Sequence, residues 1–425
     1  MGERTTENMS LMFVLVTLLY STPTSCFTFH KENNACPRLL EYPVKAFSPH
    51  CYVNPNVLSS TPEMIKQNGY KCGTYKVVSE DGYTSLIFRV LPQEDDGGEK
   101  GQPIVLDHGV QVNSAAWTWM GNRSLAFVLA RAGYDVWLAN QRDSGYTTHI
   151  KYKTSDYRFW TTTLDDVASY EVPAILKTIA SETNKSGSII YIGHSRGTVL
   201  GFMYASEYPD EAQKYLRGVV ALAPAVYLEF SFFFKIVFYV AAIILRKIPV
   251  INYPDILTKK FYQILCTNLP HVCMLIIYAA SGSASQFLPD DLLAFYSIFP
   301  LSLSTMHFIQ LFQIYRTGRF QKYDYGKKQN ILKYGQAEPP LYHLSNVKLP
   351  VYLFYGKRDV YMKKKTVKRT FEEIGSSEKE YFSVPIGNDD PKLQFGHNDF
   401  ISSRYIEELL YQDLLKVLNK LKPKE

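Results

Sequence analysis

The pattern of apolar and polar positions changes at about residue 104. From there, short continuous apolar runs alternate with segments whose apolar residues recur at helical spacing. The runs comprise residues 104–107, 134–138, 188–192, 219–223, 351–355 and 381–384. The helical segments lie near residues 124–131, 164–179 and 403–421. Continuous apolar strands between helices are typical of a parallel sheet that is covered on both faces. The sequence therefore predicts the α/β fold class, with a mostly parallel central sheet and helices on both faces.

Three further segments precede or interrupt this alternation. Residues 70–77 and 83–90 are strand-like and are joined by a turn that contains Asp81-Gly82, so we expect an antiparallel pair at the sheet edge. Residues 26–69 are a cysteine-containing extension that we expect to wrap the outside of the fold. Residues 225–340 are aromatic, apolar and helical in pattern, and predict a cap over the strand ends. The core is then expected in two parts, residues 70–224 and 341–425.

The most informative motif is Gly193-His194-Ser195-Arg196-Gly197, which stands between the strand-like run 188–192 and the helical segment 198–206. Strand, G-x-S-x-G and helix together are the pattern of a nucleophile elbow. The turn is so tight that a Cβ at either glycine would collide with a neighbouring strand or helix. The strained turn would present the Ser195 hydroxyl at the end of the strand. We therefore predict that Ser195 is a catalytic nucleophile.

A serine nucleophile needs a base and an acid that orients the base, and after an elbow the chain order is serine, acid, histidine. Asp359 follows the apolar run 351–355, and His397 follows the run 381–384. His343 comes before the strand that leads to Asp359, which is the wrong order. The other acids considered, Asp399 and Asp324, do not end a predicted strand. The sequence thus predicts the triad Ser195, Asp359 and His397.

Two backbone N–H groups should form the oxyanion hole. One belongs to the residue after the nucleophile, Arg196, and the other to the loop after the third strand. That loop begins Asp107-His108-Gly109-Val110, and a His-Gly step lets the backbone turn sharply. We therefore expect Val110 to supply the second donor.

The composition and the first 25 residues indicate which partners and which cellular compartment to expect. The 425 residues carry a net charge of +6 without an arginine-rich patch, so no nucleic-acid partner is indicated. The apolar run 11–20, followed by small polar residues, predicts a signal peptide over residues 1–25; an uncleaved anchor is the alternative. The six cysteines fit an oxidising compartment, and their spacing suggests no metal site. Asn122 and Asn184 begin N-glycosylation sequons. No metal or organic cofactor is expected.

Residues 230–245 are almost entirely apolar and could be a membrane span or a cap element. The run is shorter than the ~20 residues that cross a bilayer, and Lys235 would lie inside it. A span would also place Ser195 and His397 on opposite sides of a membrane. We therefore expect a cap element that lines an acyl-binding groove or meets a lipid surface, and no transmembrane span.

Several segments besides the elbow carry a family resemblance, which runs from about residue 56 to the C-terminus. They are residues 80–83, 108–109, 122–127, 132–138, 170–174, 320–326, 339–342 and 397–400. Together they resemble the acid lipases of the gastric and lysosomal type, within the α/β-hydrolases. Two positions depart from the family pattern near the elbow. Arg196 stands where the family usually has Gln, and residues 139–143 read Ala-Asn-Gln-Arg-Asp instead of Gly-Asn-Ser-Arg-Gly.

The resemblance implies an α/β-hydrolase fold and a serine ester hydrolase that cleaves long-chain acyl esters, such as triacylglycerols or steryl esters, at a lipid–water interface. It also implies the triad Ser195, Asp359 and His397 and the oxyanion donors Val110 and Arg196. Secretion or lysosomal targeting is the implied location. The alternatives are a carboxylesterase for small soluble esters and a lipid-carrying protein on a hydrolase scaffold. The family has a disulfide near Cys266 and Cys273, and we predict that this pair is bonded; two buried thiols are the alternative.

Overall fold

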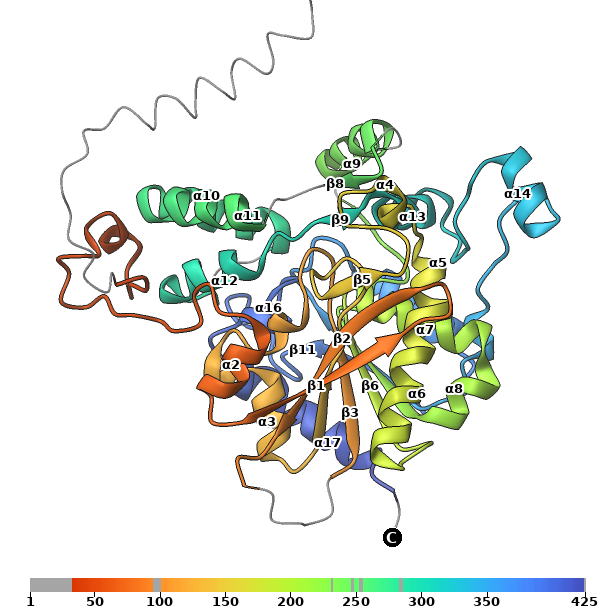
Figure 1. Ribbon diagram of the computed structural model, residues 1–425, viewed down its shortest axis with the longest axis horizontal. Coiled ribbons are helices and arrows are strands. Elements are labelled where there is room, and N and C mark those ends of the chain that lie inside the picture. Colours follow the sequence, from red (N-terminus) through yellow and green to blue (C-terminus); the bar gives the residue numbers. More distant parts are fainter. Residues whose placement is uncertain are drawn as a thin grey trace, which may run out of the picture.

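The structure is a computed structural model that describes residues 33–94, 101–230, 232–245, 248–251, 255–282 and 286–423. The predicted signal peptide, residues 1–25, and Cys26 lie outside the described residues. A large mixed sheet forms the centre of the molecule, and helices cover both of its faces (Figure 1).

The sheet has the strand order β1-β2-β4-β3-β6-β7-β10-β11, and β5 pairs with β2. The strands are β1 (Lys71–Val78), β2 (Tyr83–Leu91), β3 (Pro103–Asp107), β4 (Asp135–Leu138), β5 (Thr147–His149), β6 (Ile189–His194), β7 (Leu216–Leu222), β10 (Val351–Gly356) and β11 (Lys379–Val384). From β4 to β11 every neighbouring pair is parallel. Strands β3, β4, β6 and β10 consist of buried residues throughout, as their continuous apolar sequence predicts.

The first two strands form the expected antiparallel hairpin at the sheet edge, with residue pairs from Lys71–Leu91 to Val78–Thr84. The turn between them contains Gly82 at φ +94°, a conformation that favours glycine. Strand β2 also runs antiparallel to β4 and so joins the hairpin to the parallel part of the sheet.

Helices lie on both sides of the sheet. The core helices are α2 (Thr61–Gln67), α3 (Leu125–Arg131), α6 (Val172–Thr183), α7 (Arg196–Glu207), α8 (Pro209–Tyr215), α15 (Lys364–Glu373) and α17 (Gln412–Lys420). Figure 1 shows α6, α7 and α8 on one side and α3 on the other. The C-terminal helix begins later than the sequence predicts, because Ser403 ends the short helix α16 (Asp399–Ser402) in an extended conformation. A short π-helix, Glu407–Tyr411, then leads into α17.

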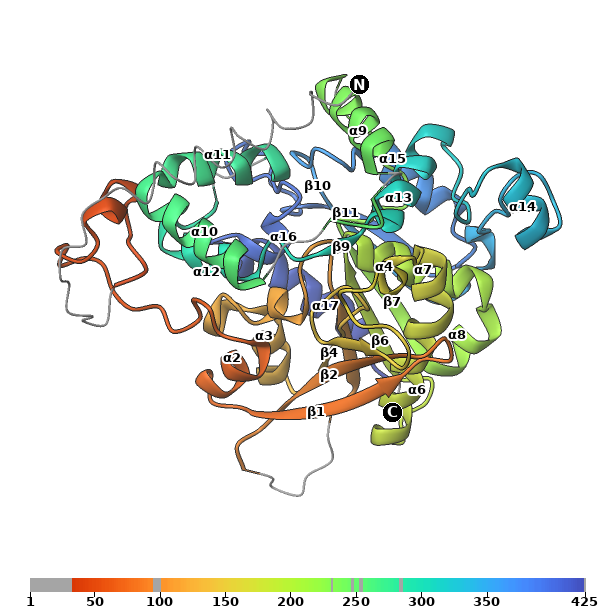
Figure 2. The same cartoon turned by 45° about the horizontal axis from the view of Figure 1, so that its top comes forward.

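Between β7 and β10 the chain forms a group of helices. They are α9 (Phe232–Leu245), α10 (Asp255–Asn268), α11 (Pro270–Ser281), α12 (Leu292–Ile298), α13 (Thr305–Thr317) and α14 (Lys327–Tyr334). A two-residue pairing of β8 (Val250–Ile251) with β9 (Leu303–Ser304) lies among them, and strands this short leave no recognisable sequence pattern. Figures 1 and 2 show α9 to α13 over one end of the sheet. We call residues 225–340 the cap segment.

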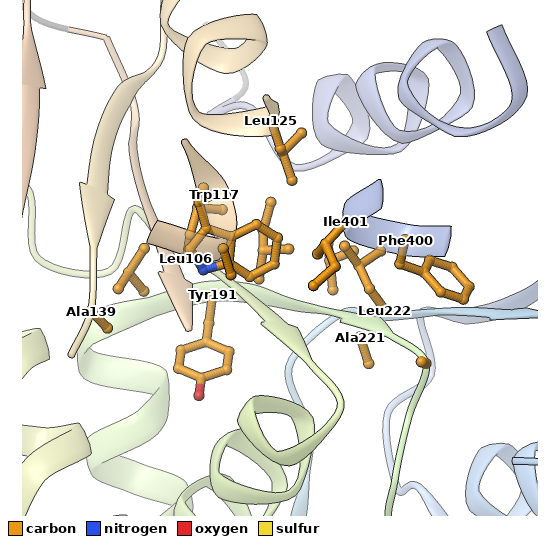
Figure 3. Close-up of a cluster of buried hydrophobic side chains, with 14 of the residues drawn as sticks. Leu106, Trp117, Leu125, Ala139, Tyr191, Ala221, Leu222, Phe400 and Ile401 are labelled. Atoms are coloured by element: carbon orange, nitrogen blue, oxygen red, sulfur yellow. The ribbon is translucent and has the colours of Figure 1, made fainter. Parts of the chain in front are cut away.

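The core beneath that end of the sheet is densely packed. Leu106 and Leu222, on β3 and β7, are completely buried. Figure 3 shows Trp117, Phe400 and Ile401 on one face of the strands, with Tyr191 directed to the opposite face. Segments that follow β3 and β11 therefore pack against one face of the sheet at the end where β6 leads into the elbow.

The N-terminal extension packs against the cap segment. A disulfide joins Cys36 to Cys51. The hydroxyl of Tyr42 donates a hydrogen bond of 2.7 Å to the carbonyl oxygen of Pro289. Within the described residues, Cys72 is a free thiol.

Candidate active site

Ser195 occupies a strained turn between β6 and α7. Its φ of +53° and ψ of −115° are rare for a residue with a side chain. A Cβ on Gly193 would lie 2.6 Å from the backbone of Gly197, and a Cβ on Gly197 would lie 2.5 Å from the carbonyl oxygen of Asp107. Both glycines are therefore required by close backbone approach, one to the helix start and the other to the end of β3, as the motif predicts.

The structure brings the three predicted triad residues together from distant parts of the chain. Nε2 of His397 lies 2.9 Å from Oγ of Ser195, and Nδ1 of His397 lies 2.9 Å from Oδ2 of Asp359. With the hydroxyl donating to Nε2, Nδ1–H donates to the carboxylate. This is the arrangement in which an imidazole can take a proton from a serine hydroxyl.

Backbone hydrogen bonds hold the Asp359 carboxylate in place. Its Oδ1 accepts from the N–H groups of Tyr361 at 2.8 Å and Met362 at 3.1 Å, while Oδ2 accepts from His397. The residue is completely buried. These hydrogen bonds fix the direction of the carboxylate, so Asp359 is suited to orient the imidazole.

The other acids and the other histidine considered lie in different settings. Oδ2 of Asp399 accepts a hydrogen bond of 2.6 Å from the N–H of Gly396, within the loop that carries His397. Oδ1 of Asp324 accepts from the backbone of Gly326 and the side chain of Asn330. His343 is exposed, before a short helical turn.

His194 supports the histidine loop in a way that sequence reasoning missed. Its Nε2–H donates a hydrogen bond of 3.0 Å to the carbonyl oxygen of His397. Burial, together with the nearby His397 ring, lowers the pKa of His194 to about 3, so its ring stays neutral. Its position inside the elbow was the only available signal, because the partner lies 203 residues away.

The two predicted oxyanion donors border the same cavity as Ser195. Arg196 is the first residue of α7, so its N–H has no acceptor inside the helix. Val110 lies in the loop after β3 and lines the cavity beside Ser195. A Cβ on the preceding Gly109 would lie 3.4 Å from Cβ of Ser195, which shows how closely this loop approaches the nucleophile.

The cavity beside Ser195 has a volume of about 250 Å³ and is mainly apolar. Core and cap both contribute to its walls. The apolar residues that line it include Leu228, Phe230, Phe295, Phe299, Leu303, Phe308, Leu311, Phe312, Met362 and Ile401. Helix α13 contributes three of these side chains, Phe308, Leu311 and Phe312. The cavity can therefore receive an aliphatic chain next to the hydroxyl.

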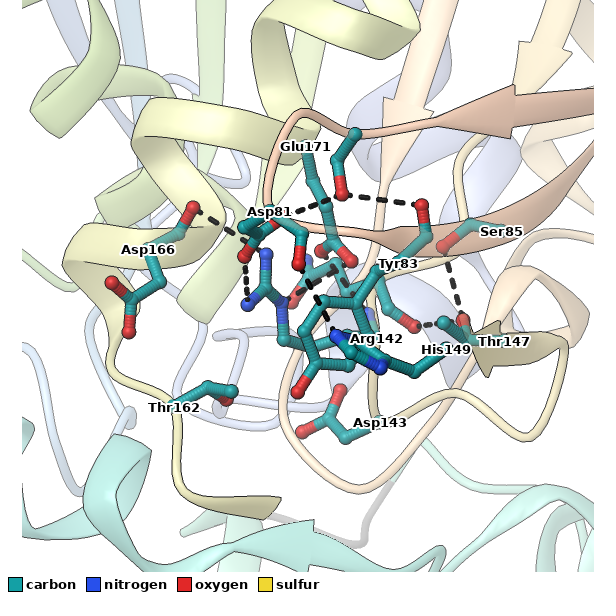
Figure 4. A network of polar contacts seen from close by, with 12 residues as sticks. Asp81, Tyr83, Ser85, Arg142, Asp143, Thr147, His149, Thr162, Asp166 and Glu171 are labelled. Carbon is teal, nitrogen blue, oxygen red and sulfur yellow. Dashed lines mark hydrogen bonds and ion pairs between the residues drawn. The ribbon is translucent and has the colours of Figure 1, made fainter. Parts of the chain in front are cut away.

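The segment after β4, at which the sequence departs from the acid lipase pattern, contains two buried charged residues, Arg142 and Asp143, that form three ion pairs. Arg142 contacts Asp81, in the hairpin turn, at 2.9 Å and Glu171 at 3.2 Å (Figure 4). Its guanidinium also lies 4.1 Å from the ring centre of Tyr83. The next residue, Asp143, pairs with Arg196. The structure thus joins the two departures from the family pattern, Arg196 and Asp143, in one contact.

Other predicted residues have the following positions. Cys266 and Cys273 form a disulfide between α10 and α11. Asn122 and Asn184 are exposed, and their glycosylation stays a prediction.

In the parts of the chain that the structure describes, no group of three or more His, Cys, Asp or Glu side chains could hold a metal ion. No single helix there is long and apolar enough to cross a membrane; α10 and α11 together reach that length and composition only as a pair bent by 113°.

Comparison with known proteins gives consistent matches. Residues 102–387 match the family described as alpha/beta hydrolase fold, and residues 61–121 match the partial alpha/beta-hydrolase lipase region. The chain is 28% identical to gastric triacylglycerol lipase of Rattus norvegicus, over 86% of this chain and 93% of the relative. Identity to the Homo sapiens gastric triacylglycerol lipase is 30%, over 72% and 80%. Triacylglycerol lipase 2 of Arabidopsis thaliana is 29% identical, over 81% and 84%. A putative lipase structure from Acinetobacter baumannii aligns with a TM-score of 0.48 at 14% identity, over 85% and 97%.

Proposed function

This chain belongs to the α/β-hydrolase fold family and is a carboxylic ester hydrolase of the triacylglycerol lipase type, and we propose that it cleaves long-chain acyl esters through an acyl-enzyme on Ser195. The observation that carries the proposal is the hydrogen-bonded series Ser195–His397–Asp359 at the wall of an apolar cavity. Triacylglycerols and steryl esters are the substrate class.

In the proposed reaction, His397 Nε2 takes the proton of the Ser195 hydroxyl as Oγ attacks the ester carbonyl carbon. Asp359 keeps the imidazole in the tautomer that can accept this proton and stabilises the imidazolium. The N–H groups of Val110 and Arg196 stabilise the oxyanion, and loss of one such donor typically costs about 10²–10³ in kcat. His397 then gives the proton to the leaving alcohol. Water attacks the acyl-enzyme with the same residues in the same roles, and the fatty acid leaves.

The cap segment, residues 225–340, is proposed to form the acyl-binding wall and the contact with the lipid–water interface. The outer helices expose many apolar side chains, which supports this role. We call the following set the apolar cap surface: Ile236, Tyr239, Val240, Ile243 and Ile244 of α9, Leu257, Phe261 and Ile264 of α10, and Val272, Leu275 and Ile276 of α11. Figures 1 and 2 show these helices at the end of the molecule away from the sheet.

The proposed location is the secretory pathway, with secretion or lysosomal delivery. The two disulfides of the structure support an oxidising environment, where such bonds form and persist.

A labelling experiment tests the proposal. A fluorophosphonate probe should modify the wild-type protein and not the Ser195→Ala variant. The variant should unfold at the same thermal midpoint as the wild type. Hydrolysis of emulsified triacylglycerol and steryl ester should disappear with the labelling. A wild-type protein that binds these lipids but is not labelled would be a lipid carrier. A rate that does not rise when a substrate passes from monomer to emulsion would favour a carboxylesterase for small soluble esters.

A further inference from the structure

The side chain of Arg196 forms a completely buried ion pair directly behind the nucleophile. Nη1 lies 2.5 Å from Oδ2 of Asp143, and Nη2 lies 2.8 Å from Oδ1, so the guanidinium and the carboxylate meet through two parallel hydrogen bonds. The exposed fraction of the two side chains is 0% and 2%. Such a fork fixes the relative orientation of both groups more strongly than a single contact does.

A cap residue completes this cluster. Nδ1 of His307, on helix α13, lies 3.2 Å from Nη1 of Arg196, and its Nε2 lies 3.3 Å from Oγ1 of Thr162. Burial lowers the pKa of His307, so the ring is neutral. In the tautomer with the proton on Nε2, Nδ1 accepts a hydrogen bond from Arg196 and Nε2–H donates to Thr162. The same Nδ1 also lies 3.4 Å from Oδ2 of Asp143, so His307 contacts both members of the ion pair. Burial alone would raise the pKa of Asp143. The neighbouring Arg196 nevertheless holds that pKa well below its usual range, so the carboxylate is charged.

The cluster joins three parts of the chain that build the candidate site. Arg196 follows Ser195 and starts α7, Asp143 belongs to the loop after β4, and His307 belongs to the cap helix α13. The residue after His307 is Phe308, which lines the cavity beside Ser195. A movement of this cluster would therefore displace the first N–H of α7 and one wall of the cavity together.

The Arg196–Asp143 pair is better explained by its effect on the orientation of neighbouring groups than by a gain in folding stability. Removing two charges from water costs several kcal/mol per ion, and apolar residues can often replace a buried ion pair without loss of stability. A contribution to folding stability therefore does not account well for this ion pair. Its fork geometry lies beside a reaction in which a displacement of about 1 Å can cost 10²-fold in rate.

We propose that Arg196, Asp143 and His307 are positioning residues, which hold the oxyanion-donating N–H of Arg196 and the cavity-lining helix α13 in register with Ser195. The inference rests on the proposed ester hydrolysis and adds to it a role for three side chains that do not touch the substrate. The Arg196 side chain acts through its own backbone, Asp143 acts through Arg196, and His307 connects this pair to helix α13.

The chain contains a matched control pair. Arg89 and Asp135 form the same kind of buried fork, with contacts of 2.7 and 2.8 Å, between β2 and the start of β4. The exposed fractions of their side chains are 8% and 2%. Neither residue lines the cavity beside Ser195. The test uses the full chain and measures kcat and KM for p-nitrophenyl butyrate, together with the thermal midpoint, for Asp143→Asn, Arg196→Lys, Asp135→Asn and Arg89→Lys.

All four variants are expected to lower the thermal midpoint. Only Asp143→Asn and Arg196→Lys should lower kcat, by about tenfold or more, with KM within about threefold of wild type. Arg196→Lys keeps the charge and removes the fork, so it separates orientation from charge and remains informative if Asp143→Asn does not fold. Equal kcat changes at the two pairs, or an unchanged kcat in Arg196→Lys, would overturn the positioning role. A wild-type protein without Ser195-dependent turnover would instead refute the proposed function, and the positioning role with it.

Discussion

The carbonyl oxygen of Ser281, the last residue of helix α11, accepts a hydrogen bond of 2.7 Å from the backbone N–H of His397. The hydroxyl of Ser281 accepts a second hydrogen bond, of 3.0 Å, from the N–H of Asn398. The next residue, Gly282, lies against the loop that carries Asp359. The end of one cap helix therefore contacts the loops that carry His397 and Asp359, the proposed base and acid, so the cap segment supports the proposed triad as well as the cavity.

Gly282 provides a direct test of this support. A Cβ at this position would lie 2.1 Å from the carbonyl oxygen of Arg358, the residue before Asp359. Gly282→Ala should push the acid loop away from His397 and lower kcat by about tenfold or more, since small misplacements of reacting groups are costly.

Gly318→Ala is the control for this substitution. Gly318 ends helix α13 at φ +63°, as Gly282 ends α11 at φ +83°, so both substitutions carry a similar backbone strain. Around Gly318 the nearest atom to a Cβ is 3.8 Å away, on the Arg369 side chain. Turnover of a soluble ester by Gly318→Ala should stay within about twofold of wild type. Equal losses in the two variants would show that strain alone, and not contact with the acid loop, matters.

The choice of acid leads to a second prediction. Asp359→Asn should reduce kcat by about 10⁴, by analogy with other serine triads, because the amide favours the wrong imidazole tautomer. Asp399→Asn should cost much less, because its carboxylate caps the N–H of Gly396 within the histidine loop. Measurement of kcat for both variants on one soluble ester decides between them. A larger loss in Asp399→Asn would move the acid to that residue.

The apolar cap surface leads to a third prediction. Ile236 and Ile243 are 51% and 50% exposed and are separated by two turns of α9, so they lie on one side of that helix. Ile236→Ser with Ile243→Ser should weaken hydrolysis of emulsified triacylglycerol several-fold while hydrolysis of p-nitrophenyl butyrate changes little. Leu332→Ser is the control, because Leu332 is 76% exposed but belongs to α14. Parallel losses on both substrates would argue against a lipid-contacting role for α9.

Much of the core could be predicted from the sequence, because buried parallel strands have a continuous apolar pattern and the elbow has fixed glycines. Asp359 could be predicted because it follows the buried strand β10, and His397 because it follows the short apolar run in β11, which is only partly buried. The Arg196–Asp143 contact could not be predicted. Its partners are 53 residues apart, one in the loop after β4 and the other at the start of α7, and neither residue type indicates which buried charge it will meet. The contacts of His194 and Ser281 with the histidine loop involve backbone groups, which carry no sequence signal. Helix α9 could be assigned to the cap, but its exposed side followed only from the way it packs.

The last prediction concerns pH and Asp165, at the start of the short helix α5 (Leu164–Asp166). Its carboxylate accepts hydrogen bonds from the side chains of Gln310 and Tyr342 and from the backbone N–H of Tyr323. These contacts join the core to residues on either side of α14. Burial, with a smaller contribution from Asp166, raises the pKa of Asp165 to about 6. Since an aspartate in an unfolded chain has a pKa near 3.9, the folded protein binds the proton more tightly.

Between about pH 4 and pH 6 the folded state holds more protons than the unfolded state at this residue, so the free energy of unfolding falls as pH rises through that window. Thermal midpoints of wild type and Asp165→Asn, measured from pH 7.5 to 4.5, should therefore diverge, with wild type gaining on the order of 1–2 kcal/mol relative to the variant on acidification. Asp156→Asn is the control. In the wild type, hydrogen bonds from Arg158 lower the pKa of Asp156 to about 2, below the scanned range. The difference in thermal midpoint between Asp156→Asn and wild type should therefore stay nearly constant. If the offset of Asp165→Asn were equally constant, Asp165 would be ionised in the folded protein throughout this range. Its three hydrogen-bond donors would then outweigh the effect of burial.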